Sequence, residues 1–341
     1  MRAPDFWWHS ERTASAMALT PAGWLMGRIA ARRMAQTGAD AGVAVICVGN
    51  FVAGGAGKTP TALACAKLLQ ASGYRPAFLS RGYGGSAARS GPPLRVDPMR
   101  HDAALTGDEP LLLAQCAPTI VSADRRAGAA AAISAGADVI VMDDGLQNPA
   151  LLKDFSIAVV DGETGVGNGL CIPAGPLRAP FEFQLGYVDA LLRIGDGQAG
   201  ERVAGRAQAR GIATFHGDLR TPTGATHNFA GQRVVAFAGI GRPGKFFASL
   251  EAVGAQVVDA YSFDDHQMLN ASDLADLRAK AHAQRARLAT TEKDAARLRG
   301  THDIADVLIL PVELTIAAAP AFAALMLDAI KRKRAAGRNR P

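Results

Sequence analysis

The segment 43–69 restricts the possible folds of this chain more than any other stretch. It begins with a β-branched run ending at Val48, continues through a glycine-rich stretch, and passes at Lys58 and Thr59 into Ala- and Leu-rich residues. The residue types and spacing predict a buried strand followed, after the loop, by a helix. Strand, glycine loop, Lys-Thr and helix, in that order, are typical of a P-loop that wraps a nucleoside triphosphate. The segment therefore predicts an α/β fold of the P-loop NTPase type, with a mostly parallel sheet flanked by helices.

The loop supplies the groups that a triphosphate and its magnesium ion require. Successive backbone N–H groups face the phosphates, Lys58 reaches the β- and γ-phosphates, and the Thr59 hydroxyl holds Mg²⁺. The predicted nucleotide-binding residues are Gly54, Gly55, Ala56, Gly57, Lys58, Thr59 and Pro60. The loop is a variant, because Val52 stands where the usual pattern has its first glycine, and an ordinary glycine-rich turn remains the alternative.

Composition limits the remaining classes of function. A chain of 341 residues that is 49% hydrophobic is long and apolar enough for two domains with packed cores. Its four cysteines show no metal-ligand spacing, so we expect buried free thiols in a reducing compartment. The formal charge of +6 is matched by six cations in the tail 331–341, which leaves the body nearly neutral. A neutral body argues against nucleic-acid binding. The tail suits a solvated terminus, with contact to anionic lipid or, less favoured, to nucleic acid as the alternatives.

The first 38 residues predict an amphipathic helical segment. All three tryptophans precede residue 25, and Trp24, Leu25 and Ile29 alternate with arginines such as Arg28. Such a pattern suits a helix lying in a bilayer interface, and packing on the protein's own surface is the alternative. No apolar run is long enough to span a bilayer.

Polar residues follow several predicted strands. A strand at 75–79 leads into a loop with Arg81 and Tyr83, and the apolar run before Asp143 and Asp144 ends in two carboxylates. An acidic residue at a strand end in a nucleotide-binding α/β fold coordinates or orients Mg²⁺, so both aspartates are candidate metal ligands. Asp108 precedes a predicted helix, where a simple N-cap is the favoured interpretation.

A second α/β unit is predicted after a turn-rich stretch at 218–231. We expect an N-terminal segment 1–38, a nucleotide-binding domain 39–222, a smaller α/β domain 223–330 and the basic tail 331–341. The sequence GIGRPG at 239–244 is a weak dinucleotide motif, because Pro243 interrupts it. His266 lies in a loop between carboxylates and a helix, where a solvated histidine is the ordinary interpretation.

Taken in order, these segments resemble one family, the tetraacyldisaccharide 4′-kinases, which are the lipid A 4′-kinases of Gram-negative bacteria. The resemblance covers about residues 5–325 and rests on GNFVAGGAGKTP, SRGYGG, GDEP, DDGLQ, NG followed by PAGPLR, FAGIGRPGKFF, FDDH and TTEKDAARL. Each motif alone is common, but the ordered set is specific, and the family carries the same variant loop.

The resemblance implies transfer of the ATP γ-phosphate to the 4′-hydroxyl of a tetraacylated glucosamine disaccharide 1-phosphate. It implies that Asp108, paired with His266, activates the attacking hydroxyl, which suits a carboxylate beside an incoming alcohol. It further implies Mg²⁺ at Thr59 with Asp143 or Asp144. The implied substrate-binding residues are Arg81, Tyr83, Arg125, Gln147, Asn168 and Arg178. Ala179 stands where the family often has a glutamate, so no role is carried over for that acid.

A kinase for a lipid-tailed disaccharide must reach it at the membrane. The resemblance therefore implies a peripheral protein at the cytoplasmic face of the inner membrane, held by the N-terminal helix with help from the basic tail. The alternative is a membrane-recruited switch ATPase of the partition or division-site type. That class has a lysine directly before the paired glycines, where this chain has Ala53.

Overall fold

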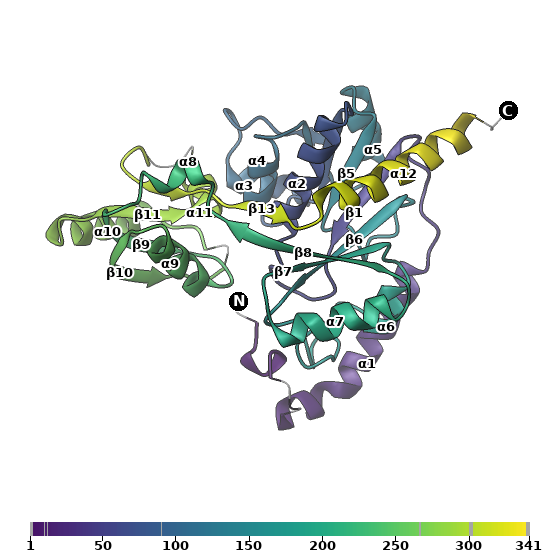
Figure 1. The fold of residues 1–341 in the computed structure, drawn as a ribbon, viewed down its shortest axis with the longest axis horizontal. Helices are drawn as coiled ribbons and strands as arrows, with labels where there is room; N and C mark the ends of the chain where they lie inside the picture. The colour runs from purple at the N-terminus through teal and green to yellow at the C-terminus, as the bar shows by residue number, and fades with distance from the viewer. Residues whose placement is uncertain are drawn as a thin grey trace.

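The computed structural model describes residues 3–9, 11, 13–89, 91–265, 267–299 and 303–338, which form two α/β units (Figure 1). The sheet of the first unit has the spatial order β13-β8-β7-β6-β1-β5-β2-β4-β3. Neighbouring strands are parallel, except that β3 is antiparallel to β4 and β13 to β8. Its strands are β1 (Ala44–Gly49), β2 (Pro76–Ser80), β3 (Leu94–Arg95), β4 (Thr119–Val121), β5 (Val139–Asp143), β6 (Phe155–Asp161), β7 (Ala190–Ile194), β8 (Ala213–Arg220) and β13 (Glu313–Ile316).

Helices cover both faces of this sheet, which explains why β1 and β5 are buried along their whole length. The helices of the first unit are α1 (Ala14–Met34), α2 (Lys58–Ala71), α3 (Ala103–Thr106), α4 (Asp108–Leu113), α5 (Arg125–Ser134), α6 (Phe181–Leu185), α7 (Gln198–Gln208) and α12 (Ala319–Arg338). Two short 3-10 helices, η1 (Asp5–Trp7) and η2 (Ser86–Ala88), complete the list of helical segments described in this unit.

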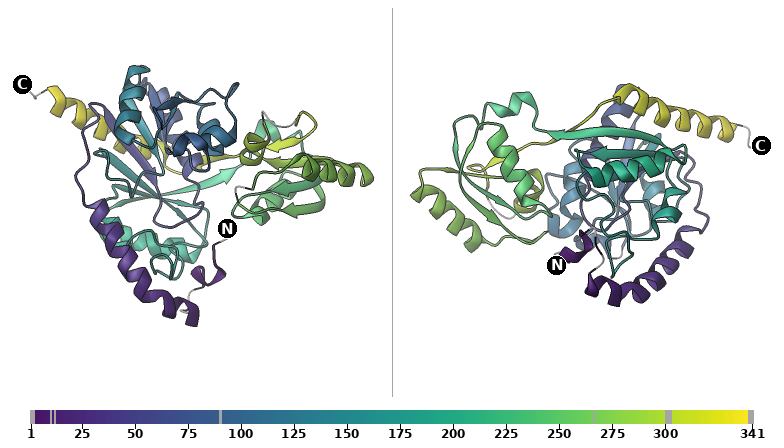
Figure 2. Two further views of the ribbon diagram at one scale, coloured as in Figure 1. Left: turned by 180° about the vertical axis from the view of Figure 1, so that it is seen from behind. Right: turned by 60° about the horizontal axis from the view of Figure 1, so that its bottom comes forward.

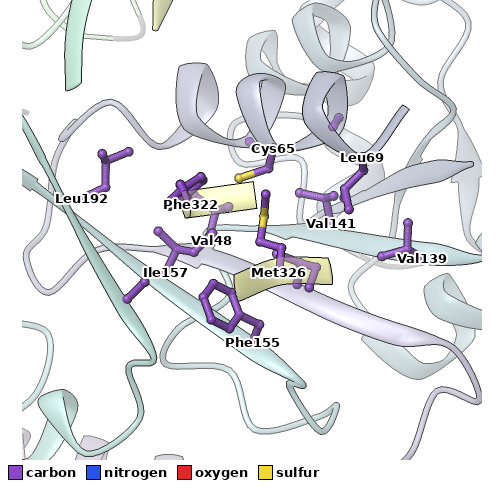
Figure 3. Packing of buried hydrophobic residues seen from close by; sticks show 14 of the residues in the cluster. Val48, Cys65, Leu69, Val139, Val141, Phe155, Ile157, Leu192, Phe322 and Met326 are labelled. Atoms are coloured by element: carbon purple, nitrogen blue, oxygen red, sulfur yellow. The ribbon is translucent and has the colours of Figure 1, made fainter. Parts of the chain in front are cut away.

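The larger core lies between the sheet and the helices α2 and α12. Figure 3 shows Phe322 and Met326 of α12 with Cys65 of α2 against Val48 and Ile157 of the sheet. All five side chains are fully buried, and burying each large one contributes about 1.5–3 kcal/mol. The cysteine is a free thiol inside an apolar core, as the sequence predicts.

Alternate residues of the same strands point to the opposite face. Val45 of β1 and Met142 of β5 pack with Ala129 and Ala132 of α5, whereas their neighbours in the chain face α2. Farther along the sheet, Val203 of α7 belongs to the cluster beneath β6 and β7. The period of two in a strand places these residues on opposite faces.

The second unit is a smaller sheet with helices on both faces. Its spatial order is β10-β9-β11-β12, and all described pairs are parallel. The elements are α8 (Thr223–Thr226), β9 (Arg233–Ala238), α9 (Pro243–Ala252), β10 (Gln256–Ser262), α10 (Ala271–Ala283), β11 (Arg287–Thr291), α11 (Glu292–Leu298) and β12 (Leu308–Leu310). Helix α9 packs on one face, with Phe246 and Leu250, and α10 on the other, with Leu274 and Leu277.

The chain does not end in the second unit. After β12 it returns to the first unit as β13, which pairs with β8, and as α12, which packs on the large core (Figure 1). The sequence-based boundary at residue 330 is therefore wrong, and the second unit ends near Leu310. An α-helix after a strand is equally compatible with either sheet, so the sequence pattern alone does not assign it.

The basic tail begins inside α12 rather than after it. Lys333 forms ion pairs with Asp40 and Asp154, and Arg334 pairs with Asp138 and lies over the ring of Tyr74. These two cations fasten the helix to the first unit, which limits their use for lipid contact.

Helix α1 runs along the outside of the first unit, on the side opposite α12 (Figure 2). Gly23 and Gly27 lie on its inner face, and a β-carbon at Gly23 would come 2.6 Å from the Cys171 carbonyl oxygen. Trp7, in η1, is buried and donates its indole N–H to the Pro173 carbonyl at 3.0 Å. The alternative interpretation, packing on the protein's own surface, is therefore correct for Trp7, whereas the Trp24 side chain is 62% exposed. Within the described residues, no helix is long and apolar enough to cross a bilayer.

Candidate active site

The loops that follow the parallel strands meet at one edge of the first sheet. The carboxyl ends of β1, β2, β4, β5 and β6 lead into the P-loop and into the loops carrying Arg81, Arg125, Asp144 and Glu163. Parallel strands place such ends side by side, and ligands of open α/β sheets bind there. The sequence-predicted residues are thus gathered by topology.

The P-loop has the conformation that its glycines permit. Gly54 and Gly57 have φ angles of 110° and 87°, which favour glycine, and Gly57 is the N-cap of α2. Lys58 and Thr59 are the first residues of that helix, and both are buried. The Lys58 ammonium group donates to the Gly54 carbonyl at 3.1 Å and lies 3.8 Å from an Asp144 oxygen. Burial lowers the pKa of Lys58, and Asp144 opposes that shift.

The two aspartates at the end of β5 have different surroundings. Asp143 is buried, its Oδ1 atom has no hydrogen-bond partner, and burial together with Glu109 and Asp144 raises its pKa to about 7. Burial would also raise the pKa of Asp144, but Lys58 and Arg178 outweigh it and hold that pKa below its usual value. A buried carboxylate oxygen without a partner is costly, and a cation would satisfy it.

A chain of side-chain hydrogen bonds fixes the P-loop to Asp144. Arg178 forms a bidentate pair with Asp144, at 2.8 and 3.0 Å, and donates to the Val52 carbonyl. Gln147 accepts from Arg178 and donates to the Asn50 carbonyl, both at the base of the loop. Gln147 and Arg178, which the resemblance assigns to the substrate, therefore contact the P-loop and Asp144.

Gln184 of α6 completes this chain of hydrogen bonds, and the sequence did not predict it. Its side chain is fully buried, donates to the Phe51 and Ala179 carbonyls, and accepts from Gln147 at 2.7 Å. No sequence motif identifies it, because its role depends on burial between three loops.

The RGYGG loop packs directly against the start of α4. A β-carbon at Gly85 would come 2.5 Å from backbone atoms of Leu105 and Gly107, and one at Gly107 would meet the Tyr83 carbonyl oxygen at 2.5 Å. Only glycines permit this approach, which sets Tyr83 beside the helix that begins at Asp108. Gly107 is the N-cap of α4, so the N-cap interpretation of Asp108 is wrong; Asp108 is the first helical residue and is buried.

Two cations of α11 reach across from the second unit to α4. Arg297 contacts Asp108, with Nη2 to Oδ2 at 2.5 Å, and Lys293 donates to Glu109 at 2.7 Å. Lys293 is the main cause that lowers the pKa of Glu109. Both cations lie in the motif TTEKDAARL, yet the sequence predicts no role for either. Their proximity to the acids of α4 depends on how the two units meet, which no local pattern encodes.

The remaining predicted residues are distributed around this edge. Arg125 is buried, donates to the Ser122 carbonyl, and has its pKa lowered to about 10 by burial, with Asp143 opposing. Arg81 is exposed, and Tyr83 is 70% exposed. Asn168 lies farther away, where its amide donates to the Phe6 and Ala174 carbonyls and so anchors the N-terminal segment. His266 lies outside the described residues.

No cluster of three or more His, Cys, Asp or Glu side chains with metal-binding geometry occurs among the residues that the structure describes. Mg²⁺ usually takes one or two carboxylates, a hydroxyl and phosphate oxygens rather than a full protein cage. Thr59, Asp143 and Asp144 therefore fit such an ion, and the unpartnered Oδ1 atom of Asp143 favours one.

Comparison with known proteins identifies the family. A family model described as "Tetraacyldisaccharide-1-P 4'-kinase" matches residues 15–331. The chain belongs to this family. A tetraacyldisaccharide 4′-kinase from Methylobacterium sp. (strain 4-46) is 54% identical over 98% of this chain and 99% of its own. Another from Methylobacterium nodulans is 55% identical over 92% of this chain and 91% of its own.

The fold is also similar to that of a solved structure. The "apo" form of LpxK from Aquifex aeolicus, in complex with ATP, matches with a TM-score of 0.70 and 23% identity over 92% of this chain and 99% of that one. The predicted fold class and the predicted family are thus confirmed, and the chain is a lipid kinase. The switch-ATPase alternative is not favoured, because the family match spans both units.

Proposed function

We propose that this kinase transfers the γ-phosphate of ATP to the 4′-hydroxyl of a tetraacylated glucosamine disaccharide 1-phosphate. The observation that carries the proposal is the convergence, at one sheet edge, of a P-loop lysine, a pair of acids after β5 and the buried carboxylate of Asp108. The curated relatives are named for this activity, and the similar LpxK structure holds ATP.

The P-loop supports the nucleotide assignment. A β-carbon at Gly54 or Gly55 would meet nothing within 4 Å, so the loop has open space beside it into which phosphate oxygens can fit. Lys58 would exchange its bond to the Gly54 carbonyl for the β- and γ-phosphates. Thr59 with Asp143 and Asp144 would hold Mg²⁺, and that ion, when bound, neutralises charge on the phosphates.

Asp108 would accept the proton of the acceptor hydroxyl while the hydroxyl oxygen bonds to the γ-phosphorus and ADP leaves. Asp108 contacts Arg297 and the Glu109 N–H, and each oxygen of a carboxylate has two lone pairs with which it accepts hydrogen bonds. His266 is proposed as its partner. The transfer otherwise depends on positioning and on charge neutralisation.

The anionic disaccharide needs cationic and hydrogen-bonding partners beside Asp108. Arg81, Tyr83 and Arg125 follow strands at the same edge and are proposed to bind it. Gln147 and Arg178 are proposed to shape the cleft, since their side chains hold the P-loop at this edge. Asn168 is proposed to do so from farther away, by holding the loop that follows β6.

The lipid chains of the substrate favour membrane contact through α1. Trp24, Leu25, Met26 and Ile29 are each more than half exposed, and Arg28 lies 4.8 Å from the Trp24 ring. An exposed apolar face flanked by arginines suits an anionic bilayer interface. We therefore propose peripheral binding at the cytoplasmic face of the inner membrane.

The activity is tested by transfer of labelled phosphate from ATP to a detergent-dispersed disaccharide 1-phosphate lipid. We expect Mg²⁺-dependent product from the wild type and its loss in the Lys58→Ala and Asp108→Ala variants. ATP hydrolysis without lipid labelling would refute the proposed kinase activity, and full activity of Asp108→Ala would refute its role as base.

Membrane contact is tested by flotation with vesicles that contain anionic phospholipid. Replacing Trp24 and Ile29 by alanine should reduce bound protein, because both apolar side chains enter the interface. Met99→Ala is the matched control, since Met99 is 92% exposed on another surface of the same unit. Equal flotation of all three proteins would exclude α1 as the anchor.

A further inference from the structure

Helix α11 belongs to the second unit, yet one of its side chains ends on the carboxylate of the first unit that is proposed to activate the acceptor. Arg297 is only 3% exposed, and its Nε and Nη2 atoms lie 2.8 and 2.5 Å from Oδ2 of Asp108. Asp108 is equally buried, at 4%. The pair joins residues that are 189 positions apart in the chain.

The guanidinium group is held from behind by its own unit. Its Nη1 atom donates to the Gly239 carbonyl at 2.6 Å and to Oδ1 of Asp294 at 2.8 Å. The same Asp294 oxygen accepts the Gly239 N–H at 3.1 Å. The arginine is therefore fixed in one orientation before it contacts Asp108, and its planar shape makes this possible.

Asp108 is held from its other side by the first unit. Its Oδ1 atom accepts the N–H of Glu109 at 2.9 Å. With one oxygen on the backbone and the other on Arg297, rotation of the carboxylate is restricted. The orientation of Asp108 is thus set jointly by both units.

Stability alone is a weak reason for such an arrangement. Removing two charges from water costs about as much as their attraction returns, and apolar residues of similar volume serve a core equally well. A second pair beside it, Lys293 with Glu109, repeats the pattern of a cation from α11 on an acid of α4. A buried pair with a partly buried pair beside it, at one contact, favours a role in orienting the acids.

We infer that Arg297 is a positioning residue for the phosphoryl transfer, which holds the Asp108 carboxylate in the orientation needed to take the acceptor proton. This inference rests on the proposed function, because it assigns Asp108 as the base. Through Arg297 the second unit takes part in the reaction centre by orienting Asp108 and not by binding the substrates.

The test compares steady-state kcat and KM of the full-length kinase for ATP and for the lipid in detergent micelles. The variants are Arg297→Gln, Arg297→Lys, Asp108→Asn and the double variant Asp108→Asn with Arg297→Gln. Arg278→Gln is the matched control, because Arg278 forms a bidentate pair with Asp306 within the second unit, away from this contact. Thermal unfolding and ATP binding are measured on each protein.

We expect Arg297→Gln to lower kcat by about thirtyfold or more while both KM values change by less than about threefold, because a general base contributes about 10²–10⁴-fold. Arg297→Lys should retain about tenfold more activity than the glutamine variant, since it keeps the charge but loses the planar fork. In the Asp108→Asn background, Arg297→Gln should have no further effect on kcat. Arg278→Gln should leave the kinetics unchanged.

The outcomes separate the inference from the proposed function. Loss of activity in Asp108→Asn with a normal kcat in Arg297→Gln overturns the inference alone. Full activity of Asp108→Asn overturns both. If the two substitutions lower kcat independently in the double variant, Arg297 is only a structural contact. The same conclusion holds if Arg297→Gln changes KM and the melting temperature as well as kcat. If the glutamine variant does not fold, a normal kcat of Arg297→Lys overturns the inference, and a reduced kcat with unchanged KM values supports it.

Discussion

Replacing Gln184 by methionine isolates the hydrogen bonds that fix the P-loop, because methionine has a similar volume but no strong donor. The change leaves the Ala179 carbonyl, bonded at 2.6 Å, without its side-chain donor, whereas the Phe51 carbonyl keeps the Arg178 backbone N–H at 2.9 Å. An orphaned buried polar group costs about 1–3 kcal/mol, so the substitution should lower the free energy of unfolding by that amount. Gln147 keeps its bond to the Asn50 carbonyl and adds no second orphan.

The assay is urea denaturation followed by far-UV circular dichroism, together with kinetics at varied ATP. Loss of the support beneath the loop should also reduce kcat/KM for ATP by about tenfold, because small displacements of reacting groups are costly. Gln208→Met on α7 is the matched control, since that glutamine bonds Thr214 on the exposed surface and should change stability by less than about 0.5 kcal/mol. Equal unfolding midpoints and equal ATP kinetics for the two variants would refute the reasoning.

Burial and close contact lead to three further predictions. Without nucleotide and Mg²⁺, the wild type should lose stability relative to Asp143→Asn as pH rises from about 4 to about 7. The reason is that the pKa of Asp143 is raised in the native state, so the unfolded state releases this proton first. Denaturation at several pH values measures this difference in the free energy of unfolding, and a difference that changes in the opposite direction with pH would contradict the prediction. Gly23→Ala should destabilise the protein by about 1–3 kcal/mol, because its β-carbon clashes with the Cys171 carbonyl. Gly205→Ala should stabilise it by about 0.5–1 kcal/mol, because that β-carbon meets nothing within 4 Å. Melting temperatures that move in the same direction in both variants would exclude the close packing of α1 against Cys171. Phe322→Ala should cost about 3–5 kcal/mol if α12 belongs to the first core, and a urea midpoint close to that of the wild type would argue that it does not.

Most of the fold follows from local patterns in the sequence. In the second unit, β-branched runs predict strands near 255–260, 286–290 and 306–310, which are close to β10, β11 and β12. Strand β8 was missed, because Ala213–Arg220 mixes polar and apolar residues without a clear period. The return of β13 and α12 was also missed, since it depends on which sheet has an open edge and an uncovered face.

The site was predicted to a smaller extent, for a related physical reason. Lys58, Asp143 and Asp108 are recognisable because each ends a strand or starts a helix in a motif of fixed spacing. Arg297 and Gln184 each bond one partner more than 130 positions away, so only the packed structure identifies their roles.

The second unit is an insertion between β8 and β13, and this connectivity has a consequence for synthesis on the ribosome. Residues 233–310 are contiguous and can close their own sheet as soon as they emerge, whereas the core beneath β1 lacks Phe322 and Met326 until α12 has been translated. Domains generally fold as units during synthesis, at about 5–20 residues per second. The nascent nucleotide-binding half therefore keeps an apolar face exposed until α12 has emerged, after the whole of the second unit. Chaperone binding during biosynthesis should concentrate on this apolar face of the sheet, which α12 later covers.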